Sequence, residues 1–131
     1  MLVSNNPEEG LRVYIIDWEM ARCAQPEMDV GSFAMMSWSI ADRYPSKDSF
    51  RLVQEFYKSY RKHFSVDVVQ VGLWSGTDVM SYGSTVKWAK DRDERTLESI
   101  ARTGVDLLEA VRERDVDSIR KSLVLRDMYA E

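Results

Sequence analysis

Cysteine, histidine, proline and long apolar runs are all scarce in this sequence, which holds one cysteine, one histidine and three prolines among 131 residues. A lone cysteine, Cys23, cannot form an internal disulfide, and this favours a reducing compartment. No apolar stretch approaches the roughly 20 residues of a membrane-spanning helix, and no basic segment leads into an apolar one as in a signal peptide. We therefore expect a cytoplasmic protein without a membrane segment.

An excess of positive charge is also missing. Lysine and arginine number 18 against 22 aspartates and glutamates, so the net charge is -4. This balance does not predict a positively charged surface that could bind nucleic acid or an anionic membrane, and we expect neither partner. The single histidine, His63, follows an arginine and a lysine and has no aspartate two residues later, so we expect a surface residue near a helix end.

The amount of apolar sequence suits one compact domain. With 131 residues and 44% hydrophobic content, the chain is long enough for a single core, and we expect one domain over residues 1–131. Residues 2–3 and 11–16 are apolar stretches separated by turn formers, which predicts an N-terminal β-hairpin. The second strand is apolar at nearly every position, so both its faces should be covered, and it stops at Asp17.

Helical periodicity dominates the rest of the chain. Asp29 is expected to cap a central helix that is apolar nearly all round, and Ser46 to cap an amphipathic helix that reaches residue 64. A third helix should follow over residues 67–90, where three glycines imply either close packing or a break near Gly76. The clearest stripe spans residues 97–111; a short last helix should start at Asp115 or Asp117, with fraying after it. These elements predict a mainly α fold with a small N-terminal β-hairpin, in the α+β class.

One segment resembles a known family. Residues 13–21 read V-Y-I-I-D-W-E-M-A, and residues 26–30 read P-E-M-D-V. This stretch resembles the "I-D-W/F-E-x-A … P-x-x-D-hydrophobic" pattern of aminoglycoside phosphotransferases and choline-kinase-like proteins. The resemblance implies part of the C-terminal lobe of a protein-kinase-like fold, with ATP and magnesium as cofactors and a small-molecule hydroxyl as the phosphate acceptor.

The resemblance also implies roles for four residues. Asp17 would hold the magnesium of bound ATP, as hard Mg²⁺ prefers carboxylate oxygen. Glu19 would assist weakly through water, and Trp18 would pack beneath the site as structural support. Asp29 would support the catalytic loop from the start of the next helix. Spacing alone favours a strand-ending carboxylate that caps a turn for Asp17, and a helix cap for Asp29.

Other parts of the family pattern do not occur in these residues. The family requires a phosphate-covering loop, an ATP-positioning lysine and a catalytic segment of the type H-x-D-x-x-x-x-N, and His63 begins no such segment. We expect the first residue to follow directly on that catalytic segment. A single carboxylate without its partner ligands binds magnesium and ATP weakly, so we expect an inactive fragment of a phosphotransferase.

Two other classes of function remain open. A non-enzymatic helical module could bind a protein partner or associate with itself through exposed apolar surface. A metal-dependent hydrolase built on Asp17, Glu19 and Asp29 is disfavoured, because no histidine is near in sequence to complete it.

The acceptor is the least determined part of the prediction. Three tryptophans on the expected helices could line an acceptor pocket, although aromatic residues on helices more often belong to the core: Trp38, Trp74 and Trp88. Aminoglycoside, choline-like amine and sugar all stay possible as acceptors. Cys23 is interpreted as an incidental thiol.

Overall fold

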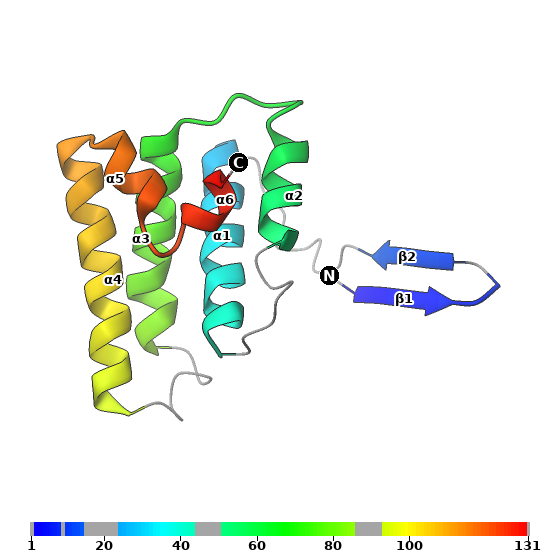
Figure 1. The fold of residues 1–131 in the computed structure, drawn as a ribbon, viewed down its shortest axis with the longest axis horizontal. Helices are drawn as coiled ribbons and strands as arrows, with labels where there is room; N and C mark the ends of the chain where they lie inside the picture. The colour runs from blue at the N-terminus through cyan, green and yellow to red at the C-terminus, as the bar shows by residue number, and fades with distance from the viewer. Residues whose placement is uncertain (1, 9, 15–23, 44–50, 86–92, 131) are drawn as a thin grey trace.

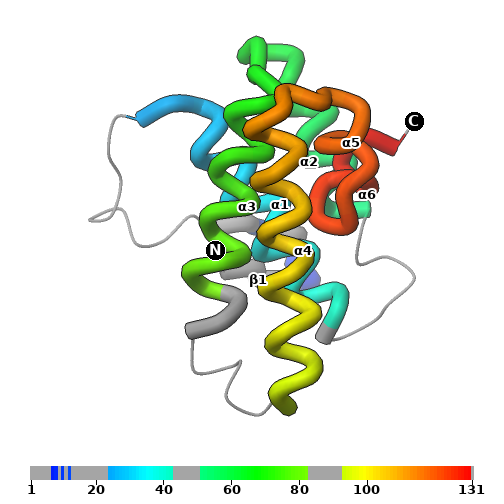
Figure 2. Tube along the Cα trace, turned by 90° about the vertical axis from the view of Figure 1, so that its left-hand side faces the viewer, coloured from blue at the N-terminus to red at the C-terminus, as the bar shows by residue number. Residues whose placement is uncertain are grey.

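The computed structural model describes residues 2–8, 10–14, 24–43, 51–85 and 93–130. Their elements in chain order are β1 (Leu2–Asn6), β2 (Gly10–Tyr14), α1 (Pro26–Arg43), α2 (Arg51–Tyr60), α3 (Val68–Thr85), α4 (Glu94–Glu113), α5 (Val116–Lys121) and α6 (Arg126–Tyr129). Helices α4, α3 and α1 stand side by side, with α2 beyond α1 (Figure 1). The short α5 and α6 lie on one side of this layer (Figure 2). No helix in the described ranges combines the length and the apolar character that crossing a membrane requires.

The expected α+β class is wrong. The body of the described structure is built from helices alone, so the fold is a small all-α one. The backbones of β1 and β2 pair with each other, with Leu2 opposite Tyr14, but neither strand makes an extended contact with a described helix. Two strands without a helix packed on them form no layer of a core. We expected both faces of the second strand to be covered, but most side chains of this strand lie outside the described part of the chain.

Close approach between helices explains the glycines of α3. A Cβ added at Gly76 would lie 2.8 Å from Leu108 Cδ2 of α4, and one added at Gly31 of α1 would lie 2.8 Å from Trp74 Cβ and 2.9 Å from the Val71 carbonyl oxygen. At Gly31 the backbone atoms nearby leave no room for a side chain, whereas at Gly76 the Leu108 side chain would have to move aside. Because α3 runs unbroken from Val68 to Thr85, close packing is the correct alternative and a break at Gly76 is not.

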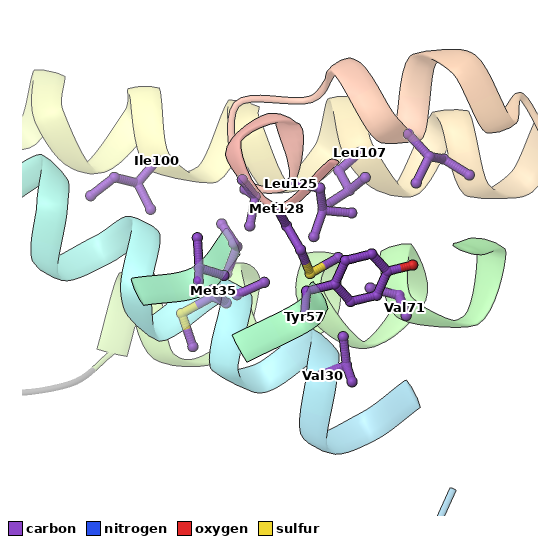
Figure 3. Close-up of a cluster of buried hydrophobic side chains, with 13 residues drawn as sticks. Val30, Met35, Tyr57, Val71, Ile100, Leu107, Leu125 and Met128 are labelled. Carbon is purple, nitrogen blue, oxygen red and sulfur yellow. The ribbon is translucent and has the colours of Figure 1, made fainter. Parts of the chain in front are cut away.

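The core lies where α1, α2, α3 and α4 meet the C-terminal segment. Its buried residues form one cluster: Val30, Ala34, Met35, Val53, Tyr57, Val71, Val79, Ile100, Leu107, Ile119, Val124, Leu125 and Met128 (Figure 3). Helix α1 is central to this cluster but is not buried all round as expected. Met36 and Ile40 are 44% and 54% exposed, which leaves one apolar face of α1 open.

Several helix boundaries differ from those expected. Helix α1 begins at Pro26, because proline suits the first helical position, where no backbone N–H donor is needed. Asp29 therefore lies in the first turn and is not the N-cap. Helix α2 ends at Tyr60, and Phe64 beyond it is exposed; the expected Ser46 cap lies outside the described residues. Helix α4 starts after Asp93, whose carboxylate accepts a hydrogen bond from Thr96 N at 2.7 Å.

The C-terminal segment does not fray, contrary to expectation. Asp115 caps α5 by accepting hydrogen bonds from the Ser118 backbone N at 3.1 Å and hydroxyl at 2.6 Å, as one of the two predicted starts requires. After α5 the chain turns, and α6 packs against α2. Leu125 is completely buried and Met128 nearly so. The last turn is thus part of the core.

The two capping aspartates make stability depend on pH. Hydrogen bonds from Thr96 lower the pKa of Asp93, and those from the side chain and then the backbone of Ser118 lower the pKa of Asp115. A carboxyl group with a lowered folded pKa stabilises the fold above its unfolded pKa of about 3.9, and this stabilisation is lost as pH falls through the folded pKa. We expect urea midpoints to drop below about pH 4, and to drop less in the Asp93→Ala/Asp115→Ala double variant. An Asp106→Ala control should keep the full drop; an unchanged drop in the double variant would contradict the assignment.

Candidate functional site

Most residues of the predicted magnesium site lie outside the described part of the chain. Asp17, Trp18, Glu19 and Cys23 all fall in residues 15–23, so their expected roles have no geometry to be compared with. Within the described residues, no group of three or more histidine, cysteine, aspartate or glutamate side chains is placed to hold a metal ion. His63 is exposed in the turn after α2, as expected for a surface residue.

Asp29 is exposed in the first turn of α1, next to the acidic Glu27. Negative side chains there are favourable, because the N-terminal end of a helix carries partial positive charge. Burial, then the charges of Asp29 and Glu27, raise the pKa of Tyr60 on α2. The structure therefore places Asp29 near the C-terminal end of α2, where its charge acts on Tyr60.

Glu27 was missed by the sequence interpretation. Its Oε1 accepts a hydrogen bond from the Asp67 backbone N at 3.1 Å, while Asp67 Oδ1 accepts one from Val69 N at 2.8 Å. One carboxylate thus joins the start of α1 to the start of α3. The contact spans 40 residues of sequence, and no local pattern indicates it.

A candidate site is a cleft of about 470 Å³ between α1 and α3, which we call the α1–α3 cleft. Its walls carry thioether, aromatic, hydroxyl and carboxylate groups, among them those of Met28, Ser32, Met36, Trp74, Asp78 and Tyr82. Its size is within the range of about 300–1,000 Å³ that small-molecule sites occupy. A mainly apolar wall with few polar groups is the usual composition of such a site.

Two polar groups give this cleft its chemistry. The Ser32 hydroxyl donates to Asp78 Oδ2 at 2.6 Å, a short bond typical of a charged acceptor. Trp74 Nε1 is buried and makes no hydrogen bond within the described residues. A carboxylate has about four acceptor sites, so Asp78 can accept further donors beside Ser32. The cleft thus offers acceptors for hydroxyl or ammonium groups, and the Trp74 indole lies in its wall.

Asp78 was also missed, although the sequence held a signal for it. It is the one charged residue in the whole of α3, from Val68 to Thr85. A lone carboxylate in an otherwise uncharged helix that packs on two others has few partners and is costly to bury unless it is hydrogen-bonded. Ser32 supplies that bond from α1.

The tryptophans do not share one pocket in the described structure. Trp74 lines the α1–α3 cleft, whereas Trp38 lines a separate cleft of about 450 Å³ beside the start of α4, with Asp42 and Arg95. Trp38 also packs against the core, as the more common role of such residues predicts. Trp88 lies outside the described residues.

Comparison with known proteins found no relative of this chain. No protein-family model, no curated protein and no solved structure matches the chain.

Proposed function

We propose that this chain is a fragment of a cytoplasmic phosphotransferase that uses ATP and magnesium to phosphorylate a hydroxyl group of a small molecule. Two features support the proposal. Residues 13–30 resemble the metal-binding stretch of aminoglycoside phosphotransferases and choline-kinase-like proteins, with Asp17 as magnesium ligand and Glu19 as a weaker one. The α1–α3 cleft offers a place for the acceptor.

The hydrogen bond from Ser32 to Asp78 is the single observation that carries the acceptor assignment. Phosphoryl transfer demands little covalent work from a protein and depends on positioning the acceptor and stabilising charge. A partly buried carboxylate that already binds one hydroxyl can bind another from an acceptor. The methionine and aromatic side chains of the cleft then hold its carbon skeleton, because thioethers adapt to irregular shapes.

Binding of hydroxylated compounds at the cleft can be measured through the Trp74 indole N–H signal in NMR spectra. We expect a panel of a hexose, a linear polyol and an amino alcohol to include at least one compound that shifts this signal with saturation. Asp78→Asn should weaken that binding about tenfold, because hydrogen bonds to a charged acceptor are worth roughly 1.5–3 kcal/mol. Thr77→Ala, which changes an exposed neighbour on α3, should leave it intact. If the Asp78→Asn variant bound the same compound equally well, Asp78 would not be the group that binds the acceptor hydroxyl.

Metal and nucleotide binding are tested separately by calorimetry with Mg²⁺ and ATP. We expect weak heat that disappears in Asp17→Asn, since one carboxylate anchors magnesium poorly without partner ligands. We expect no ATP turnover, because these 131 residues contain no catalytic segment of the type H-x-D-x-x-x-x-N. Turnover that Asp17→Asn abolished would contradict the expected inactivity.

An interaction module is the second candidate, and one observation favours it. Met36 and Ile40 form an exposed apolar face on α1, and Leu73 and Tyr82 of α3 are exposed as well. Exposed apolar patches often mark surfaces that bind another protein or a second copy of the same chain. Absence of any heat with Mg²⁺ and ATP, together with self-association in sedimentation, would favour this function over phosphotransfer.

A further inference from the structure

A second surface of the molecule combines positive charge with aromatic rings. A groove of about 630 Å³ lies between α2 and the C-terminal α5 and α6, and it shares no lining residue with the α1–α3 cleft. We call it the tyrosine groove and define it by Glu55, Tyr57, Lys58, Arg61, Arg120 and Tyr129. Its residues come from positions 54–61 and 120–130, so only the docking of the C-terminal segment on α2 creates it.

The charges in this groove are unbalanced. Lys58, Arg61 and Arg120 line it, against one carboxylate in its wall, that of Glu55. Among the described residues, none of the three cations forms an ion pair with a carboxylate. In a chain with a net charge of -4, three unpaired cations around one groove make a local positive field.

Both arginines lie over tyrosine rings. Arg61 Cζ is 5.9 Å from the centre of the Tyr57 ring, and Arg120 Cζ is 5.5 Å from that of Tyr129. The two rings pack edge to face, with centres 5.0 Å apart. A guanidinium attracted to a nearby ring still presents its N–H donors, and the ring limits its freedom of movement. The four side chains therefore bring two forked donors together with two packed rings.

The hydroxyl of Tyr129 lies beneath this arrangement. Its Oη is buried, forms no hydrogen bond of good geometry within the described residues, and lies close enough to the Tyr57 hydroxyl to interact with it. Burial is the main cause that raises the pKa of Tyr129, with a contribution from Tyr57, so the phenol keeps its proton at neutral pH. The negative charge of Asp67, which lies just before α3 and does not line the groove, also raises the pKa of Tyr129, but less than the other causes do.

We infer that the tyrosine groove binds a small phosphate monoester, with the phosphate between the arginines and the organic part against Tyr129. Arginine forks match phosphate oxygens in paired hydrogen bonds, and a dianion suits several cations better than a single carboxylate does. The volume fits a small molecule, whereas the net negative charge of the chain disfavours a long polyanion. This assignment stands on the geometry of the groove and does not depend on the proposed phosphotransferase function.

Phenyl phosphate is the probe for this site, with inorganic phosphate, benzoate and phosphatidylglycerol vesicles as comparisons. NMR shifts of backbone amides in residues 54–61 and 120–130 report binding at the groove. We expect saturable binding of phenyl phosphate that is tighter than that of inorganic phosphate or benzoate, and no binding to the vesicles. Equal affinity for phenyl phosphate and inorganic phosphate would overturn the assignment to an ester, and binding to vesicles alone would overturn the small-molecule assignment.

Variants test whether the groove itself is responsible. Arg61→Gln and Arg120→Gln should each weaken phenyl phosphate binding about tenfold, because each removes a charged fork of donors. Tyr129→Phe should weaken it by a smaller factor while keeping the ring. Arg102→Gln, at an exposed arginine of α4, is the matched control and should change nothing. Thermal unfolding identifies any variant with a damaged fold. Equal weakening in Arg102→Gln, or no saturable binding at millimolar probe, would overturn the proposal.

Discussion

Leu125→Ala is expected to lower the free energy of unfolding by about 2–5 kcal/mol, the range measured when a buried leucine is truncated in a packed core. Leu125 is fully buried and lies with Met128 in a cluster that includes residues of α1, α2, α3, α4 and α5 (Figure 3). Truncation would remove dispersion contacts and leave a cavity in this cluster. Urea denaturation followed by far-UV circular dichroism measures the loss.

Leu123→Ala is the matched control for this result. The same chemical change is made two residues earlier, where the side chain is 48% exposed, so its effect should be a small fraction of that at Leu125. Similar and small losses at both positions would mean that the C-terminal segment frays in solution, as its sequence suggested. A large loss at Leu125 alone confirms that α6 belongs to the core.

Gly31→Val is expected to destabilise the fold by about 2–3 kcal/mol, because overpacking in a close helix contact forces neighbouring atoms apart. A Cβ at this position would meet Trp74 Cβ at 2.8 Å and the Val71 carbonyl oxygen at 2.9 Å. Backbone atoms cannot rotate away, so α1 and α3 would have to separate. The separation should also change the distance between the two walls of the α1–α3 cleft and weaken binding there. Chemical denaturation and the Trp74 indole signal give the two measurements.

Gly76→Ala tests whether crowding against backbone atoms, and not the replacement of a glycine by itself, accounts for the loss of stability expected in Gly31→Val. There a Cβ would meet the Leu108 side chain at 2.8 Å, which can shift to a new rotamer. Alanine also favours the helix by up to about 1 kcal/mol over glycine, which offsets part of the crowding. We expect a smaller loss of stability than in Gly31→Val. If Gly31→Val were as stable as the unchanged protein, the α1–α3 distance in solution would have to be larger than the structure shows.

Local sequence patterns predicted the helices well where each helix has one buried stripe. The stripe over residues 97–111 falls within α4, where Ile100, Gly104 and Leu107 are buried. The amphipathic pattern after residue 50 covers α2, where Val53 and Tyr57 are buried, but it continues to Phe64, beyond the end of α2 at Tyr60. The period of an α-helix fixes which side chains share a face, whatever packs on it. Periodicity failed for α1, which carries apolar residues on a face that stays exposed.

The candidate sites were less predictable than the helices. The α1–α3 cleft depends on Ser32 and Asp78, which are 46 residues apart, and the tyrosine groove depends on the C-terminal segment reaching α2. Hydroxyl, carboxylate and guanidinium groups on helix surfaces are common, and nothing local marks the few that converge. The resemblance of residues 13–30 pointed to Asp17, which lies outside the described residues, and left the acceptor unassigned.

The sequence alone predicted that α1 to α5 are helical and that an aspartate, Asp115 or Asp117, starts α5, because these features depend on neighbours within a few residues. It also fixed the absence of an excess positive charge. Only the tertiary structure decided that Gly31 and Gly76 mark close contacts, and that Leu125 completes the core. The physical reason is that burial depends on which surfaces meet. A short apolar segment such as residues 123–128 has no periodicity of its own, and its stability comes from the helices it packs against.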